Sequence, residues 1–127
     1  MKLTNDFNFN EFQCNDNSAM PIWVQTNIKL LAEELQKLRD ELGRPIRINS
    51  AYRSPEYNQK VGGAKNSQHL YGKAADIVVK NMNPDEVADA IEFLIEEGKL
   101  NIKGLGRYNS FTHVDIRDNK ARWDYRK

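Results

Sequence analysis

The sequence is poor in cysteine and in long apolar runs. Its single cysteine, Cys14, excludes an intramolecular disulfide and any cysteine-rich zinc site. No apolar run approaches the roughly 20 residues that a membrane-spanning helix needs, so we expect no membrane insertion. The opening stretch MKLTNDFNFNEFQC has none of the apolar character of a secretory signal, so we expect a protein that is cytoplasmic as synthesised.

The chain also lacks an excess of charge of either sign. It has 19 Lys and Arg against 18 Asp and Glu, a net charge of +1, and no field that would favour nucleic acid. The C-terminal stretch RDNKARWDYRK is locally basic and contains Trp123 and Tyr125, but Asp118 and Asp124 interrupt it, so we interpret it as a solvated strand end. The 127 residues, 39% hydrophobic and 29% charged, indicate one globular domain spanning residues 1–127, which we expect to be a monomer.

Two amphipathic helices are predicted from the spacing of apolar residues. The first begins near Pro21 and ends at Gly43, with apolar residues at alternating spacings of three and four. These residues are Ile28, Leu31, Leu35, Leu38 and Leu42. The second helix has Asn83 as its N-cap and ends at Gly98. One or two further helical turns are expected in the stretch PEYNQK.

The remaining apolar segments are short and rich in β-branched residues. We predict strands from about Ile46 to Asn49 and in KAADIVV, a closing hairpin made by IKGLGRY and FTHVDIR, and a last strand in ARWDY. These elements together predict an α+β fold with a small, mainly antiparallel sheet and two main helices.

The only two histidines lie close to acidic residues. Strand alternation in FTHVDIR places His113 and Asp115 on the face opposite the β-branched residues, toward a cleft or solvent. His69 precedes Asp76 by seven residues, and Gly72 marks a sharp turn between them. If Asp76 stands on a neighbouring strand, both imidazoles and one carboxylate can converge. The spacing by itself is equally compatible with His69 as an ordinary residue near a turn.

Two neutral imidazoles and a carboxylate form a tripod that suits zinc and leaves a fourth position open. Zinc in such a site polarises a carbonyl and lowers the pKa of bound water to about 7. Hydrolysis of an amide also requires a base that takes a proton from water and passes it to the leaving amine.

Linked motifs resemble one known family. They are Ser50-Ala51-Tyr52-Arg53-Ser54, Ser67-x-His69-x-x-Gly72-x-Ala74-x-Asp76, and Gly104-x-Gly106-x-Tyr108 leading into Phe111-x-His113-x-Asp115. In this order they closely resemble the M15 zinc peptidases, within them the small branch similar to D-alanyl-D-alanine carboxypeptidases that is common in bacteriophages and bacteria. The resemblance covers essentially the whole chain, and it implies a fold shared with lysostaphin-type and hedgehog-type proteins.

The resemblance also implies roles for particular residues. It implies Zn²⁺ as the cofactor, with His69, Asp76 and His113 as its ligands. Arg53 matches a family arginine near the active site, where a guanidinium can hold a substrate carboxylate. The alternative for Arg53 is a structural role that pins the RSPEY turn through backbone carbonyls.

Four further side chains are candidates for contact with substrate. We predict that Ser67 and Tyr108 bind substrate, although Ser67 also suits a role in shaping the loop before His69. Tyr108, together with Tyr52 and Tyr71, is a candidate to hydrogen-bond a developing oxyanion, and each of the three also suits simple packing.

The sequence departs from the best-known members of the family at the general base. Many of them have an acidic residue three positions before the last zinc ligand, where this chain has Ser110. We assign the base to Asp115, which strand geometry places on the same face as His113. The alternative is that Asp115 orients a ligand imidazole or pairs with Arg53 or Arg117.

The resemblance predicts an enzyme that hydrolyses peptide bonds in bacterial peptidoglycan, as a D,D-carboxypeptidase or an endopeptidase similar to endolysins. Its expected partner is a stem peptide or a cross-link. A phage or prophage lysin of this kind would reach the cell wall after membrane permeabilisation. Two alternatives remain open: a wall-binding or zinc-stabilised module of the same fold without turnover, and a regulatory or structural domain without metal.

Overall fold

The computed structural model describes residues 1–127 as a mixture of short helices and short strands. The elements in chain order are η1 (Phe9–Phe12), α1 (Ile22–Leu42), β1 (Ile46–Ser50), α2 (Pro55–Lys60), η2 (Gln68–Tyr71), β2 (Ala74–Val79), α3 (Pro84–Glu96), β3 (Gly104–Arg107), β4 (Thr112–Asp115) and β5 (Ala121–Asp124). The two long helices and the strands lie where the sequence predicts them. The 3₁₀ turns η1 and η2 were not predicted.

The five strands form one sheet in the order β1-β2-β4-β3-β5. All neighbouring pairs are antiparallel except β3 and β5, which run parallel. The predicted α+β class, with a mainly antiparallel sheet and two main helices, is therefore confirmed. The parallel placement of β5 was not predicted, because the sequence pattern of an edge strand does not contain its direction.

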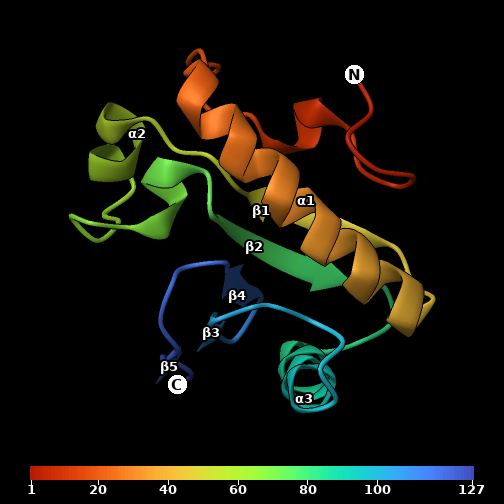
Figure 1. Cartoon of the computed structure of the whole chain (residues 1–127). Coiled ribbons are helices and arrows are strands. Elements are labelled where there is room, and N and C mark those ends of the chain that lie inside the picture. The colour runs from red at the N-terminus through yellow and green to blue at the C-terminus, as the bar shows by residue number, and fades with distance from the viewer.

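The helices α1 and α3 cover one face of this sheet (Figure 1). Gly43 ends α1 in the left-handed conformation that glycine favours, with φ of 64°. Asn83 begins α3 with a capping box shared with Glu86. Apolar residues of both helices join those of the strands in one core cluster of 24 buried residues, so this face of the sheet is closed.

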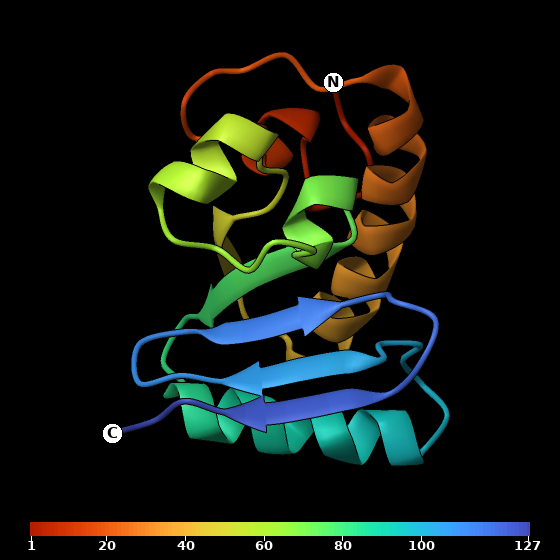
Figure 2. The same ribbon diagram turned by 90° about the vertical axis from the view of Figure 1, so that its left-hand side faces the viewer.

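The opposite face of the sheet carries the polar residues, and in Figure 2 it is turned toward the viewer, with α2 and η2 above it. Cross-strand pairing aligns one residue from each strand in a row across all five strands. In sheet order this row is Ser50, Asp76, His113, Gly106 and Trp123. Two predicted site residues, Asp76 and His113, are therefore direct neighbours on adjacent strands.

The helices of the structure indicate whether the chain contains a candidate membrane-spanning helix. None of them combines the length and the hydropathy that a membrane span requires.

Candidate metal centre

The three predicted metal ligands converge on one point of the open sheet face. Nε2 of His69 lies 3.2 Å from Oδ1 of Asp76, and Nδ1 of His113 lies 3.1 Å from the same oxygen. One ligand atom from each residue lies within 4.8 Å of the other two, and all three residues are buried. Each residue comes from a different element, so folding alone brings the group together.

His69 is held in place by the loop that contains it. The Ser67 hydroxyl caps η2 by accepting a hydrogen bond from the His69 backbone N–H at 3.2 Å, and Gly72 ends the turn with φ of 70°. A Cβ on Gly72 would lie 2.5 Å from Cγ1 of Val24, so glycine is required there both by conformation and by space. Nδ1 of His69 lies 2.6 Å from the carbonyl oxygen of Ala51, a bond that directs Nε2 toward Asp76.

His113 is oriented by a carboxylate on its own strand. Its Nε2 lies 2.7 Å from Oδ2 of Asp115, which leaves Nδ1 facing Asp76. Asp115 is 0% exposed, and Gly104 on the neighbouring strand makes the space for it, because a Cβ there would lie 2.2 Å from the carboxylate. The buried carboxylate of Asp115 thus fixes both the ring orientation and the tautomer of His113.

These contacts fit a zinc ion. Zinc bound tetrahedrally at 2.0 to 2.1 Å from its ligands separates them by about 3.4 Å, close to the distances measured from Asp76 to each histidine. Each imidazole hydrogen-bonds through its second nitrogen to a carbonyl or a carboxylate, as metal-ligating histidines usually do. The donor set therefore fits a zinc ion both in its spacing and in the partners of its histidines.

The electrostatics of the group are also those of a ligand set. Burial opposes the charge of Asp76, but hydrogen bonds from His113 and His69 outweigh burial and hold the pKa of Asp76 well below its usual range. Burial likewise opposes a charged His113, whose hydrogen bonds with Asp115 and Asp76 raise its pKa above the ordinary value in the absence of metal. At neutral pH the site therefore presents an ionised carboxylate between the two rings.

The group opens into a pocket of about 600 Å³. Its polar walls come from the loop before η2 and from Arg53, and its aromatic walls come from Tyr108, Phe111, Trp123 and Tyr125. Asp76 is the only acidic residue in the lining. A buried His-Asp-His group at the base of an open pocket is the arrangement of a catalytic metal centre rather than a structural one.

Comparison with known proteins is consistent with this geometry. Residues 5–115 match the family model of peptidase M15. The chain belongs to the peptidase M15 family. Over 94 residues it is 38% identical to a protein named zinc D-Ala-D-Ala carboxypeptidase from Streptomyces albus G, a match that covers 72% of this chain and 36% of the relative. The chain thus spans about a third of the length of that curated relative. The predicted membership of the M15 family is confirmed, and the His69, Asp76 and His113 group fits the predicted zinc cofactor.

Arg53 lies in the pocket beside Asp76. Its Nη2 donates to Oδ2 of Asp76 at 3.3 Å, its Nε to the hydroxyl of Ser50 at 3.2 Å, and its Nη1 to Oδ1 of Asn58 at 3.3 Å. Every nitrogen of Arg53 thus contacts a protein side chain, and one N–H on each of Nη1 and Nη2 remains. These are side-chain contacts, not the backbone contacts considered as the structural alternative.

Of the three tyrosines considered as oxyanion donors, the structure places only Tyr108 in the pocket. Its hydroxyl accepts a hydrogen bond from Nε1 of Trp123 at 3.0 Å, and its ring stacks on Phe111 with centroids 4.3 Å apart. Burial raises the pKa of the Tyr108 phenol, so the phenol stays protonated and able to donate. Tyr52 is buried in the core, and Tyr71 packs against Trp23.

The environment of Asp115 does not suit the general base predicted for it. Its Oδ2 accepts from Nη2 of Arg117 at 2.7 Å as well as from His113, and its Oδ1 accepts from Nε of Arg117 at 2.8 Å. Asp115 is fully buried and is absent from the pocket lining, so it has no free oxygen that reaches solvent. The geometry instead supports the alternative role of orienting His113. Ser110 is exposed and is also absent from the lining.

Sequence reasoning missed two contributors to this site, the carbonyl of Ala51 and the ring of Trp123. The carbonyl of Ala51 had no signal, because any residue offers a carbonyl. Arg117 was not missed, since the sequence already offers it as a partner of Asp115, and the structure shows that pair. Trp123 was interpreted as part of a solvated strand end, whereas its ring packs 4.8 Å from that of His113.

Proposed function

We propose that this chain hydrolyses peptide bonds in bacterial peptidoglycan, acting on stem peptides or their cross-links as a D,D-carboxypeptidase or an endopeptidase. The observation that carries the proposal is the buried His69, Asp76 and His113 group at the base of an open pocket. The similarity to the Streptomyces relative supports the choice of substrate, since that protein is a zinc D-Ala-D-Ala carboxypeptidase.

In the proposed reaction, His69, Asp76 and His113 hold zinc. The chemistry that zinc supplies when bound is polarisation of a carbonyl and acidification of water. Asp115 is a positioning residue, because it acts through the His113 ring and does not touch substrate. The carbonyl of Ala51 has the same effect on His69.

The pocket residues act on the peptide itself. Tyr108 donates its phenolic hydrogen to the oxygen that becomes negative as the carbonyl is attacked, a contact that forms fully only in the transition state. Arg53 keeps Asp76 oriented and has two donors left for a polar group of the peptide. Ser67 accepts from the His69 N–H, so its own hydroxyl hydrogen remains available to substrate.

Peptidoglycan as substrate implies action at the cell wall. We propose that the protein reaches the wall after release from the cytoplasm, in the manner of a phage or prophage lysin. The charge balance of the chain and its polar pocket support a peptide substrate over nucleic acid.

The test is digestion of purified peptidoglycan by the zinc-loaded protein, followed by mass spectrometry of the released muropeptides. We expect new products that each differ from a parent muropeptide by hydrolysis of one peptide bond, and their masses identify that bond. His113→Ala removes one zinc ligand and is the matched inactive variant. Absence of new products with a protein that binds one equivalent of zinc would refute the proposal and favour the wall-binding module.

A second measurement tests the ligand set alone. After reconstitution the protein should contain about one equivalent of zinc, and His113→Ala should contain much less. Unchanged zinc content in His113→Ala would show that the ion binds elsewhere.

A further inference from the structure

Arg117 has a free hydrogen-bonding edge in the pocket. Its Nε and Nη2 donate to the two oxygens of Asp115 at 2.8 and 2.7 Å, which occupies one edge of the guanidinium plane. Nη1 has no partner in the protein, and Nη2 has a second hydrogen without one. These hydrogens form the other edge of the guanidinium, which can donate two parallel hydrogen bonds to a second carboxylate.

This edge belongs to the pocket and is held rigidly. Arg117 lines the pocket together with the metal ligands, and its side chain is 29% exposed. The guanidinium lies over the ring of Trp123, with its carbon 5.2 Å from the ring centroid. Trp123 is fixed in turn by its hydrogen bond to Tyr108 and by Gly106, where a Cβ would lie 2.4 Å from the indole. The guanidinium is therefore pre-organised by contacts on two sides.

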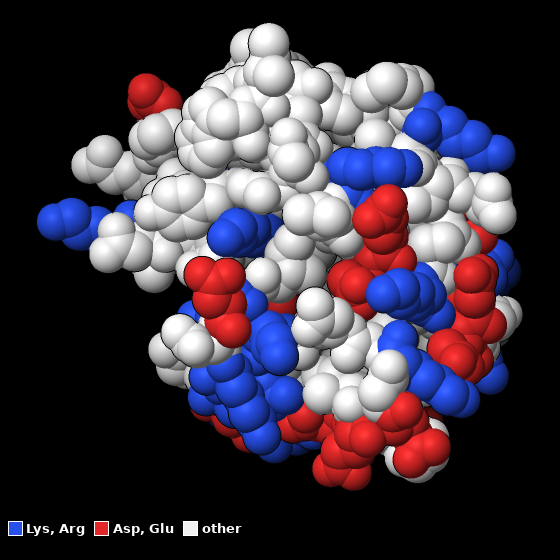
Figure 3. All heavy atoms as spheres, in the orientation of Figure 1, with Lys and Arg blue, Asp and Glu red and all other residues white.

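The charges around the pocket favour an anion. Asp76 contacts Arg53, and Asp115 contacts Arg117, so each carboxylate of the site is matched by one guanidinium. A divalent metal then leaves a net positive charge in a pocket with no other acidic residue. Figure 3 also shows Lys and Arg side chains gathered at the lower left, where β5 and the C-terminus lie in Figure 1.

We infer that Arg117 is a specificity-determining residue that binds a carboxylate of the substrate peptide through its free edge. This inference rests on the proposed hydrolysis of stem peptides and names the group that the peptide must carry. Residues 116–127, which include Arg117 and Trp123, lie beyond the matched residues 5–115. Arg53 is less suited to this role, because all three of its nitrogens already contact side chains.

A carboxylate in a stem peptide can come from two sources: the C-terminus, or an acidic side chain upstream of the scissile bond. The experiment uses two pairs of synthetic peptides that end in D-alanyl-D-alanine. One pair differs only in a free or an amidated C-terminus, and the other only in a free or an amidated side-chain carboxylate at the third residue. The value measured is the ratio of kcat/KM for acid over amide within each pair.

We expect the zinc-loaded protein to prefer the acid in one pair by about ten-fold to a hundred-fold, the range expected for charged hydrogen bonds. The responding pair identifies the source of the carboxylate. In Arg117→Gln the ratio should fall toward one, whatever happens to the absolute rate. If the substitution also disturbs His113 through Asp115, hydrolysis of both peptides of a pair slows equally. The ratio of their kcat/KM values is then unaffected.

Two controls separate the role of Arg117 from general effects. Arg122→Gln removes a basic side chain from β5 that pairs with Glu92, away from the pocket, and should keep the wild-type ratio. The Arg117→Lys variant can keep one bond to Asp115, but its ammonium group has no second edge for a substrate carboxylate. It should therefore lose the preference for the acid peptide, and it provides the test if Arg117→Gln does not fold.

A ratio near one in both pairs for the wild type, or an undiminished ratio in Arg117→Lys, would overturn the inference while leaving hydrolysis intact. Failure of the wild type to cleave any peptide would count against the proposed function instead. The two failures are therefore distinguishable.

Discussion

Replacing Asp115 by asparagine separates the two roles considered for this residue. The carboxylate accepts hydrogen bonds from the His113 ring and from the backbone N–H, Nε and Nη2 of Arg117. The amide retains one acceptor oxygen but presents an NH₂ group where a donor already points, and it removes the charge opposite Arg117. A positioning role therefore predicts damage both to the fold and to the metal site.

The expected magnitudes follow from these contacts. Hydrogen bonds to a charged group contribute about 1.5 to 3 kcal/mol each, and the partial exposure of Arg117 reduces the cost of leaving it unpaired. We expect Asp115→Asn to lower the free energy of unfolding of the metal-free protein by about 2 to 4 kcal/mol. Loss of an orienting partner should weaken zinc binding by about ten-fold to a hundred-fold.

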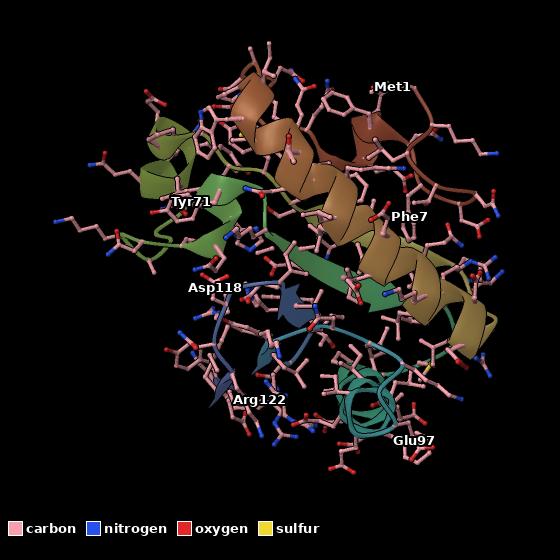
Figure 4. The ribbon with its side chains drawn as sticks, viewed as in Figure 1. Met1, Phe7, Tyr71, Glu97, Asp118 and Arg122 are labelled. Carbon is pink, nitrogen blue, oxygen red and sulfur yellow. The ribbon has the colours of Figure 1, made fainter.

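The assays are urea unfolding, zinc competition with a chromophoric chelator, and hydrolysis at saturating zinc. We expect the rate to recover to within about ten-fold of wild type once zinc saturates the variant. The matched control is Asp118→Asn, an exposed acid on the loop that joins β4 to β5 (Figure 4), which should change none of the three values. If hydrolysis vanishes while zinc affinity and stability stay at wild-type values, Asp115 is the general base and our argument is wrong.

Three further predictions concern β5 and its contacts. Gly106→Ala places a methyl group against the Trp123 indole and should cost about 1 to 3 kcal/mol in urea unfolding, whereas wild-type stability would show that the strand adapts. Trp123→Phe removes the donor to the Tyr108 hydroxyl, so kcat should fall more than KM changes, and equal kcat would exclude a contribution of that bond. The hydrogen bonds from Arg122 lower the pKa of Glu92, so this pair holds β5 on α3 above about pH 4.5 and is lost at lower pH. Hydrogen exchange of β5 amides should accelerate on acidification in the wild type and change less in Glu92→Gln.

The helices and strands follow from local sequence patterns. Apolar spacing of three and four determines α1, and Gly43 ends it because glycine readily adopts a positive φ. Alternation in β4 correctly places His113 and Asp115 on one face, because side chains on a strand alternate whatever its neighbours are. These features depend on contacts between residues that are near in the chain, and the sequence alone therefore determines them.

The chemistry of the site depends on contacts between distant segments. The strand register sets Asp76 beside His113, and the carbonyl of Ala51 fixes the His69 tautomer. The parallel pairing of β5 with β3 brings Trp123 to the pocket. Each of these contacts joins residues from separate elements. Sequence motifs identify which side chains are present but not which atoms already have hydrogen-bond partners.

Asp115 and Arg117 show this division most clearly. Their residue types are evident in FTHVDIR, and both orientation and general base catalysis suit an aspartate there. Only the tertiary structure shows that both oxygens of Asp115 are buried and bonded while one edge of Arg117 remains free. The sequence thus determined the residues of the metal centre, and packing decided their roles, because burial and hydrogen bonding control which groups can reach a substrate.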